Sequence, residues 1–230
     1  MNKAQLYAVI NRGRTHLQLH DDYPINSKYL ASRFRNRLTI EQHRFSSYSI
    51  GGILMKGEKH SMMSLNSQRD DIEQNFDCMH ELIHFLFPHP PNTYTCYNKP
   101  TQDGYYEWEA NEGAAESLVP YYKFIPELCE VYYYILKGRH YNYLKHFSEK
   151  YYVTEKVIKV RIESLTYEIN QYLAGIRLDR LRILSRKHQQ RLGIYVPSFL
   201  DPLDLALNDR NFDAKLIKYR LENILSGRAR

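Results

Sequence analysis

The segment from Asp70 to Pro88 constrains the fold of this 230-residue chain more than any other. Asp70 or Asp71 can cap the start of a helix, and Pro88 ends that helix shortly after Phe87. Apolar residues recur in between at steps of three and four, which is typical of a helix with one buried face: Ile72, Phe76, Met79, Ile83 and Leu86. The sequence therefore predicts an amphipathic helix anchored in a core.

This helix carries the motif HELIH at residues 80–84, an H-E-x-x-H pattern associated with zinc peptidases. At about 100° per residue, His84 lies roughly 40° round from His80 and one turn along, so both imidazoles can bind one ion. Glu81 lies about 60° beyond His84, which is the place for a base that activates the catalytic water. Because a chain of this length can bury a core without a metal, we expect one Zn²⁺ per chain to serve catalysis.

A catalytic zinc site needs a third protein ligand, and a second predicted helix, residues 105–119, offers four acids. Glu107 and Asn111 share the side of this helix that carries small and apolar residues. The remaining acids are predicted to face water: Glu109, Glu112 and Glu116. An acid on an apolar side is costly unless it is paired or binds a metal, so we predict Glu107 as the third ligand and keep Glu109 as the alternative. Asn111, one turn on, is a candidate to hold a ligating histidine.

Other polar side chains near the expected cleft are harder to assign. His89 follows the first helix between two prolines, and the general exposure of polar residues predicts a solvated loop histidine. Four tyrosines could each donate a hydrogen bond to a developing oxyanion, and nothing in the sequence selects one: Tyr94, Tyr97, Tyr105 and Tyr106.

Before the first helix, two apolar stretches, Tyr48–Met55 and Ser61–Leu65, flank the turn sequence KGEK and predict a β-hairpin. We expect the strand near Ser61–Leu65 to lie at an edge of the cleft and to hold extended substrate by strand addition. From Tyr121 to Arg230 the pattern is mostly helical.

The segments DCMHELIHFLFP and EWEANEGAAESLVP resemble the ImmA/IrrE metallo-endopeptidases, whose H-E-x-x-H helix precedes a segment similar to E-x-E-A-N-x-F-A-A-E-L-L-M-P. The resemblance covers about residues 45–122 and continues weakly through residues 146–165 as a helix-turn-helix-like element. Gly113 stands where the family usually has a bulky aromatic residue, which predicts looser helix packing. The family resembles the gluzincins, in which a glutamate ligand is followed four residues later by a polar residue. The resemblance therefore implies that Glu107 is a ligand and that Asn111 is this polar residue.

The resemblance implies an α+β fold. A zincin-like minidomain, with a small β-sheet and an H-E-x-x-H active-site helix, precedes a mainly helical C-terminal part. We divide the chain into a metallopeptidase domain at residues 1–125, a helix-turn-helix-like element at 126–176 and a basic helical extension at 177–230.

The function that the resemblance implies is a zinc-dependent endopeptidase. Its protein substrate would be a helix-turn-helix transcriptional repressor of a mobile element or a stress regulon. The alternative is a non-catalytic regulatory protein that binds a repressor or DNA with residues 140–230 and keeps the metal only as structure. Loss of function on changing Glu81 separates the two interpretations.

The charge of the chain is unevenly distributed. Residues 1–176 carry 20 Lys+Arg and 20 Asp+Glu, whereas residues 177–230 carry 12 and 6. Six cations fall within fifteen residues, interleaved with leucines: Arg177, Arg180, Arg182, Arg186, Lys187 and Arg191. This pattern predicts a helix that packs on one side and presents cations to a repressor or its DNA on the other. A solvated helical face is the alternative.

The sequence also predicts the location of the protein. No apolar run approaches the roughly 20 residues of a membrane span. The first residues lack a signal-peptide pattern. Three widely spaced cysteines fit a reducing compartment better than a disulfide framework. We therefore expect a cytoplasmic protein that makes no membrane contact.

Overall fold

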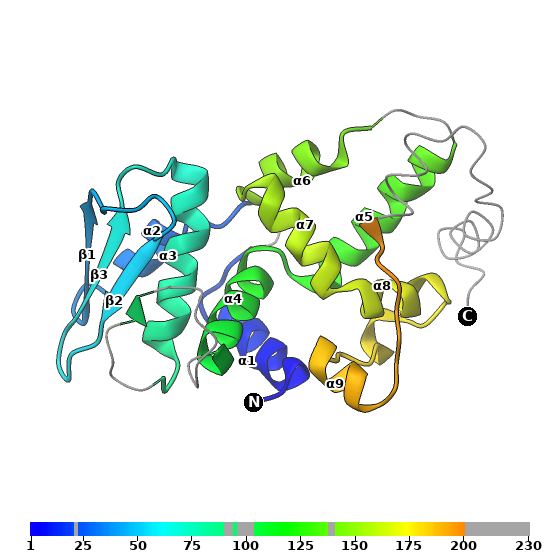
Figure 1. The fold of residues 1–230 in the computed structure, drawn as a ribbon, viewed down its shortest axis with the longest axis horizontal. Coiled ribbons are helices and arrows are strands. Elements are labelled where there is room, and N and C mark those ends of the chain that lie inside the picture. The colour runs from blue at the N-terminus through cyan, green and yellow to red at the C-terminus, as the bar shows by residue number, and fades with distance from the viewer. Residues whose placement is uncertain (21–22, 90–93, 96–103, 138–140, 201–230) are drawn as a thin grey trace. The chain divides into compact units, whose positions relative to one another are not determined.

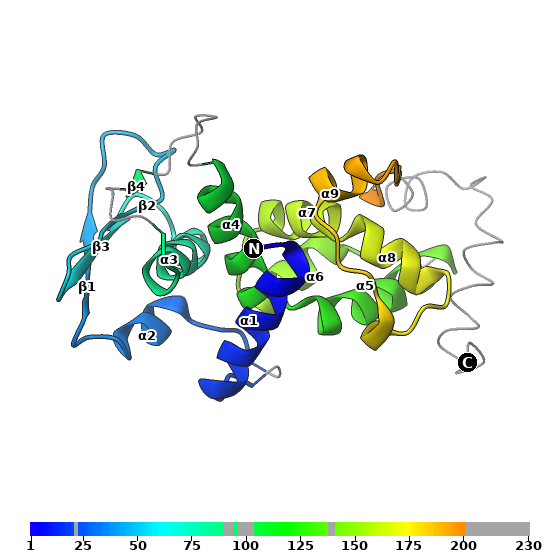
Figure 2. The same ribbon diagram turned by 90° about the horizontal axis from the view of Figure 1, so that it is seen from below.

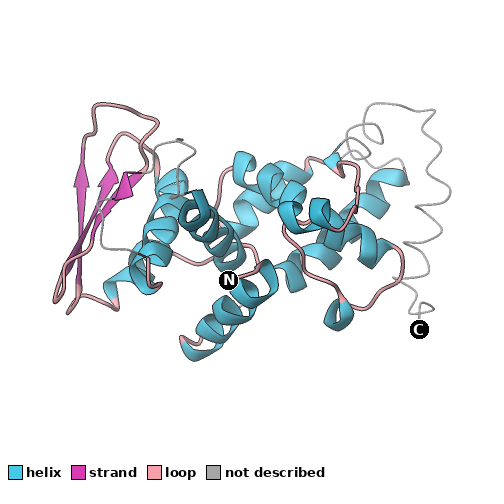
Figure 3. Ribbon diagram, turned by 60° about the horizontal axis from the view of Figure 1, so that its bottom comes forward, coloured by secondary structure: helices cyan, strands magenta, loops and turns pink. Residues whose placement is uncertain are grey.

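The structure, a computed structural model, describes residues 1–20, 23–89, 94–95, 104–137 and 141–200. The chain divides into two compact units. The site unit comprises Val9–Leu118 and Ser148–Thr154, and the helical unit comprises Met1–Ala8, Val119–Phe147 and Glu155–Arg230. In the part of the chain that the structure describes, all strands belong to the site unit and the helical unit is built from helices and loops (Figure 3). The predicted α+β fold is confirmed, and the domain boundaries at 125 and 176 stay predictions.

The site unit contains a four-stranded sheet of order β1-β3-β2-β4. Figure 1 labels its first three strands, and Figure 2 labels β4 beside β2. Its strands are β1 (Leu38–His43), β2 (Gly52–Met55), β3 (Ser61–Asn66) and β4 (Tyr94–Thr95). β3 pairs antiparallel with β2, which confirms the predicted hairpin, and parallel with β1. β3 is therefore not an edge strand. The expectation that it holds extended substrate is wrong, because its backbone groups on both sides are already used in the sheet.

Helix α3 (Asp71–Leu86) packs against β2 and β3, and α2 (Ser27–Ser32) lies beside α3 on the same face of the sheet (Figure 2). Asp70 caps α3: its side chain accepts from the backbone N–H of Glu73, and Glu73 accepts in return from the N–H of Asp70. This capping box satisfies two of the free donors at the helix start. The helix ends as the sequence predicts, with Phe87 extended ahead of Pro88.

Asn75 ties α3 to two other parts of the site unit. Its side chain accepts from the backbone N–H of Ser27 at 2.8 Å and donates to the carbonyls of Ile25 and Tyr152 at 3.0 and 2.8 Å. Asn75 is buried, and these bonds satisfy both ends of its amide. The contact with Tyr152 helps to explain why residues 148–154 belong to this unit.

Helix α4 (Gly104–Leu118) packs against α3, and Gly113 marks a point of close approach. A Cβ atom at Gly113 would lie 3.2 Å from a methyl carbon of Ile83. The expected loosening at Gly113 is therefore wrong, because the branched side chain of Ile83 fills the space above the glycine.

Helix α1 (Lys3–His16) also contacts α4 within the site unit: Asn11 donates to Glu116 at 3.0 Å, and Arg14 donates to the carbonyl of Ser117. Neighbours on two sides bury acids that we expected to face water. The exposed fractions of Glu109, Glu112 and Glu116 are 4%, 9% and 0%. The prediction of a solvated acidic face on α4 is wrong, because α4 is covered on more than one side.

The helical unit contains most of the remaining helices: α5 (Tyr121–Leu136), the first part of α6 (Tyr143–Tyr151), α7 (Glu155–Ser164), α8 (Thr166–Leu173) and α9 (Arg186–Arg191). Its core includes the edge-to-face pair Phe124 and Phe147, with ring centroids 5.1 Å apart. None of the helices in the described ranges is both long and apolar enough to cross a bilayer.

The basic segment after α8 is not the single helix that we expected through residues 177–191. Gly175, at φ 91°, follows the end of α8, and the chain then forms one 3-10 turn (Leu178–Arg180) and α9. Between them, side chains of α8 bind the extended backbone: Glu168 accepts from the N–H of Leu184 at 3.0 Å, and Gln171 bonds both the N–H and the carbonyl of Arg182. These bonds replace those of a continuous helix. Residues 201–230 lie outside the described residues.

Candidate metal centre

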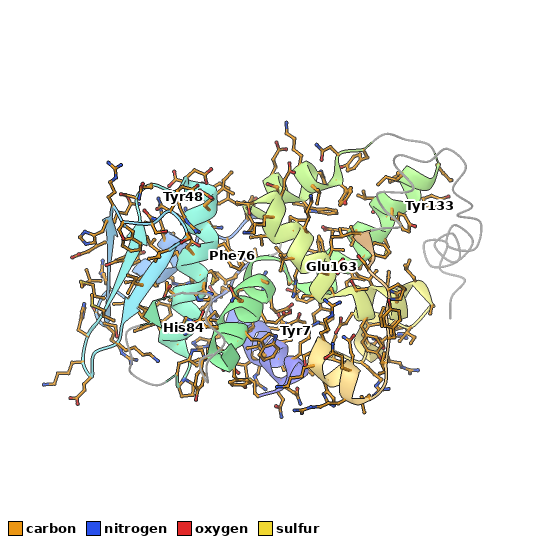
Figure 4. All side chains as sticks on the ribbon, viewed as in Figure 1. Tyr7, Tyr48, Phe76, His84, Tyr133 and Glu163 are labelled. Atoms are coloured by element: carbon orange, nitrogen blue, oxygen red, sulfur yellow. The ribbon has the colours of Figure 1, made fainter. Side chains whose placement is uncertain are left out.

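Three predicted ligands come together between α3 and the first turn of α4. His80 and His84 lie one turn apart on α3, with their Nε2 atoms 3.0 Å apart. Glu107 places Oε2 3.4 Å from Nε2 of His80 and Oε1 3.4 Å from Nε2 of His84. One potential ligand atom from each residue lies within 4.8 Å of the other two. Both histidines are buried, and the side chain of Glu107 is 22% exposed, so the cluster is open on the side of Glu107. Figure 4 labels His84 on α3.

Asn111 holds His80 from behind. Its Oδ1 lies 3.1 Å from Nδ1 of His80. An amide oxygen can only accept, so Nδ1 of His80 carries the proton and, in the neutral ring, Nε2 keeps its lone pair toward the cluster. The structure thus brings Asn111 to the place predicted for it, although the residue itself is exposed.

Glu81, the predicted base, is buried beside this cluster, 1% exposed, and packs over the backbone of β2. A Cβ atom at Gly52 would lie 2.8 Å from Cγ and 3.0 Å from Oε1 of Glu81. Asp77, one turn earlier on α3, occupies the same kind of space above Gly51 and binds Arg69 through both oxygens at 2.9 Å. The glycine pair at the start of β2 therefore makes room for two carboxylates of α3.

His89 is not the solvated residue that we expected: it is 4% exposed and lies behind His84. Its Nδ1 is 2.8 Å from Nδ1 of His84, and its Nε2 is 2.9 Å from Oε2 of Glu109. Glu109, the alternative ligand, contacts His89 rather than the cluster of His80, His84 and Glu107. The sequence signal for His89 was weak, because its burial depends on partners far along the chain.

The tyrosines near the cluster are only partly described. The hydroxyl of Tyr105 donates to Oε1 of Glu109 at 2.9 Å, and the ring of Tyr106 lies against His89 with centroids 4.9 Å apart. Tyr94 pairs through its backbone in β4, and Tyr97 lies outside the described residues. Tyr105 thus supports Glu109 in this structure, which is a different role from oxyanion donor.

The electrostatics favour the metal-binding forms of two of the three residues. Burial raises the pKa of Glu107, but its contacts with His80 and His84 outweigh burial and bring this pKa to about 2. Burial lowers the pKa of His84 to about 4, with Glu107 opposing in part. Burial also acts to lower the pKa of His80, yet contacts with Glu107, Glu81 and Asn111 raise it overall. At neutral pH Glu107 is therefore ionised and His84 neutral, and an incoming cation competes with a proton only at His80.

The donor set fits zinc. Two imidazole nitrogens and one carboxylate are the ligands that catalytic zinc takes in His₂Glu sites, with a fourth position left open. The geometry supports this fit, because Nε2 of His80, Nε2 of His84 and the carboxylate of Glu107 converge, and a bound cation would stabilise such an arrangement. His80, His84 and Glu107 are the residues that would hold it.

Comparison with known proteins identifies the family of the chain. The family model described as the IrrE N-terminal-like domain, a peptidase family, matches residues 34–163, which is more than half of the chain. The chain belongs to this family. The resemblance drawn from the sequence motifs is thereby confirmed, and membership of the IrrE-like family supports a metallopeptidase type of function. A comparison with curated proteins found no match.

Proposed function

We propose that this IrrE-like chain is a zinc-dependent endopeptidase. The observation that carries the proposal is the convergence of His80, His84 and Glu107, with the carboxylate of Glu81 buried beside them. A structural zinc site has no need of a further acid at this point, since its four ligands close the coordination sphere. An open N,N,O site with an adjacent carboxylate is instead suited to hydrolysis.

Bound zinc would supply an activated water and a polarised peptide carbonyl. In our proposal Glu81 accepts one proton from the attacking water and delivers it to the amine that leaves, so the peptide bond breaks into an amine and a carboxylic acid, which then loses its proton to solvent. Gly52, which has no side chain, leaves room for the carboxylate of Glu81 on the sheet side. Asn111 fixes the ring of His80, and the open side at Glu107 admits the substrate.

For the substrate we propose a helix-turn-helix transcriptional repressor of a mobile element or a stress regulon, whose cleavage relieves repression in the cytoplasm. This choice follows from the ImmA/IrrE resemblance. The decisive experiment is co-expression with any helix-turn-helix repressor that is encoded beside this gene, followed by mass spectrometry of the products. Wild-type protein should yield two fragments that join at one peptide bond.

The same experiment with Glu81→Gln separates the peptidase from a non-catalytic repressor-binding or DNA-binding protein. Glutamine keeps the shape of Glu81 but cannot take a proton, so cleavage should fall by about 10²–10⁴-fold, with zinc retained. Glu73→Gln is the matched control, because it makes the same change on the same helix and glutamine still completes the capping box. Cleavage by Glu81→Gln at the wild-type rate would contradict the proposed role of Glu81.

The basic segment supports a second, finer proposal about recruitment. All six cations of residues 177–191 are exposed, and five of the six excess positive charges of the chain lie within residues 177–200. We propose that they attract the repressor or its DNA complex and raise the association rate. Replacing Arg180, Arg186 and Lys187 with glutamine should slow cleavage of full repressor at low salt and spare a short peptide that spans the cleaved bond. If the triple variant cleaved full repressor at the wild-type rate at both low and high salt, the recruitment proposal would fail.

A further inference from the structure

A chain of hydrogen bonds behind His84 has no place in the proposed reaction. It runs from Nδ1 of His84 to Nδ1 of His89 at 2.8 Å, and from Nε2 of His89 to Oε2 of Glu109 at 2.9 Å. The hydroxyl of Tyr105 donates to the other oxygen of Glu109 at 2.9 Å. His84, His89 and Glu109 are each less than 9% exposed, so water competes little for these bonds.

The order of donors and acceptors in this chain fixes the proton on His84. An ionised carboxylate only accepts, so Nε2 of His89 carries a hydrogen and donates it to Glu109. The Nδ1 atom of the neutral His89 ring is then an acceptor, and the hydrogen between the two rings belongs to Nδ1 of His84. In that tautomer the lone pair of His84 lies on Nε2, the atom that faces His80 and Glu107.

Contacts from its own segment, from the sheet side and from α4 hold His89 in this position. Its backbone N–H donates to the carbonyl of Phe87 at 2.7 Å. Lys56, the residue after β2, donates to the carbonyls of Phe87 and His89 at 2.7 and 3.2 Å. The ring of Tyr106 on α4 lies against the imidazole. A loop that would otherwise be free beyond α3 is therefore fixed at His89 by both the sheet side and α4.

We propose that His89 and Glu109 are positioning residues that lock the ring orientation and the Nε2 lone pair of His84 for the metal. This inference rests on the proposed zinc site and adds two residues to it. The two histidine ligands are then held unequally. His80 contacts the neutral amide of Asn111, whereas His84 is linked through a second imidazole to the negative charge of Glu109.

Zinc affinity of the full chain, measured by competition with a chelator, is the first test. His89→Leu removes the acceptor for Nδ1 of His84 and should weaken zinc binding by about 10–100-fold. His89→Asn places an amide oxygen near the position of Nδ1 and should restore most of that loss. Glu109→Gln removes the charge but keeps an acceptor, so its effect should fall between wild type and His89→Leu. Glu116→Gln is the matched control, a buried acid on the same helix that bonds Asn11 instead, and it should leave zinc affinity unchanged.

The protonated nitrogen of His84 provides a second readout, which a purely structural role of His89 would not change. Nitrogen-15 spectra of the zinc-free, histidine-labelled full chain should show His84 protonated at Nδ1 in wild type, in His89→Asn and in Glu116→Gln. In His89→Leu, the Nε2-protonated tautomer should appear in the zinc-free protein. Equal zinc affinity and an unchanged His84 tautomer in His89→Leu would overturn the inference.

The two proposals fail in different ways. If wild type does not bind zinc, the proposed function fails, while the tautomer of His84 still tests the hydrogen-bond chain. If wild type binds zinc and His89→Leu binds it equally well, the hydrogen-bond chain fails and the metal site stands. Should His89→Leu not fold, Glu109→Gln and His89→Asn decide by the same two measurements.

Discussion

The two units each bury a cluster of ionisable side chains, and the clusters are built in opposite ways. In the helical unit the ammonium of Lys3 lies 3.1 Å from Oε1 of Glu168, with the two side chains 2% and 0% exposed. Lys3 also donates to the carbonyl of Ser164, and Glu168 accepts from the N–H of Leu184. Donors here face acceptors. In the site unit, His80, His84 and Glu107 turn lone pairs and a carboxylate toward one another.

This difference indicates what each cluster requires. A buried charge is tolerated when it is paired and hydrogen-bonded, and the chain itself supplies the positive charge at Glu168. At Glu107 the neighbouring imidazoles turn their Nε2 atoms inward, with Asn111 and His89 behind them, so a cation from outside the chain would complete the arrangement. The same physics of burial thus yields a structural ion pair in one unit and a candidate metal centre in the other.

The strongest test of this comparison removes one group from each cluster and measures zinc. Apparent binding energies of zinc sites are about 10–16 kcal/mol over four ligands, so losing one ligand should cost roughly 3–4 kcal/mol, or about 10²–10³-fold in affinity. His84→Ala should show this loss by elemental analysis and chelator competition, whereas Lys3→Met should keep full zinc. Full retention of zinc by His84→Ala would contradict the proposed site.

Stability should change most in Lys3→Met, the variant that keeps its zinc. Lys3→Met leaves the carboxylate of Glu168 buried without its cation and should lower the free energy of unfolding by about 3–5 kcal/mol. The double variant Lys3→Met/Glu168→Gln should lose less, because glutamine can still accept from Leu184 without a buried charge. Urea unfolding of the full chain measures both. A double variant as unstable as the single one would show that the cost is lost packing rather than an unpaired charge.

How much of the candidate site the sequence predicts depends on how local each signal is. The capped helix and its H-E-x-x-H motif depend on neighbours within one segment, and the structure places His80, Glu81 and His84 accordingly. Glu107 also lies where it was predicted, but the reason given for preferring it over Glu109 was wrong. Both acids are shielded, and what separates them is that Glu107 contacts His80 and His84 while Glu109 contacts His89.

Features that depend on distant partners were missed. His89 is buried by Lys56 and Glu109, residues 33 and 20 positions away, and no periodicity in its own segment records them. Strand β1 was not predicted either, because its partner β3 is parallel and reached through an intervening strand, and most of its side chains are not buried. Single-sequence patterns reveal a buried face, but they do not reveal which element covers it.

A smaller effect should come from the way each cluster positions its acid. A cation, Lys3, binds Glu168, whereas Glu81 fits into its position because Gly52 has no side chain. Gly52→Ala would place a methyl 2.8 Å from Cγ of Glu81, which is not the flexible end of that side chain, so the carboxylate must shift. We expect cleavage to fall on the order of tenfold, about 1.4 kcal/mol, with zinc content unchanged. Gly13→Ala, where a Cβ meets nothing within 4 Å, is the control and should cleave at the wild-type rate.

A further prediction concerns the pH dependence of the site cluster when zinc is absent. Burial lowers the pKa of His84 from 6.5 to about 4 in the folded protein. Between these values the unfolded chain binds a proton that folded His84 does not bind, so His84 makes the protein less stable as pH falls from 6.5 toward 4. The pKa of Glu107 falls from 4.5 to about 2 on folding, so its contribution to the free energy of unfolding is lost as pH falls from 4.5 toward 2. The pKa of His80 is raised above 6.5 on folding, so its contribution to the free energy of unfolding is lost as pH rises above 6.5.

In the presence of a chelator, the free energy of unfolding should therefore rise between pH 4 and 6.5. For one proton this slope is at most about 1.4 kcal/mol per pH unit. His84→Gln removes the titrating ring and should flatten this part of the curve, whereas His43→Gln changes an exposed histidine of β1 and should leave it intact. Urea unfolding at a series of pH values measures the slope. An equally steep rise in His84→Gln would show that His84 is not the group whose protonation opposes folding, and that its ring is less shielded in solution than its contacts indicate.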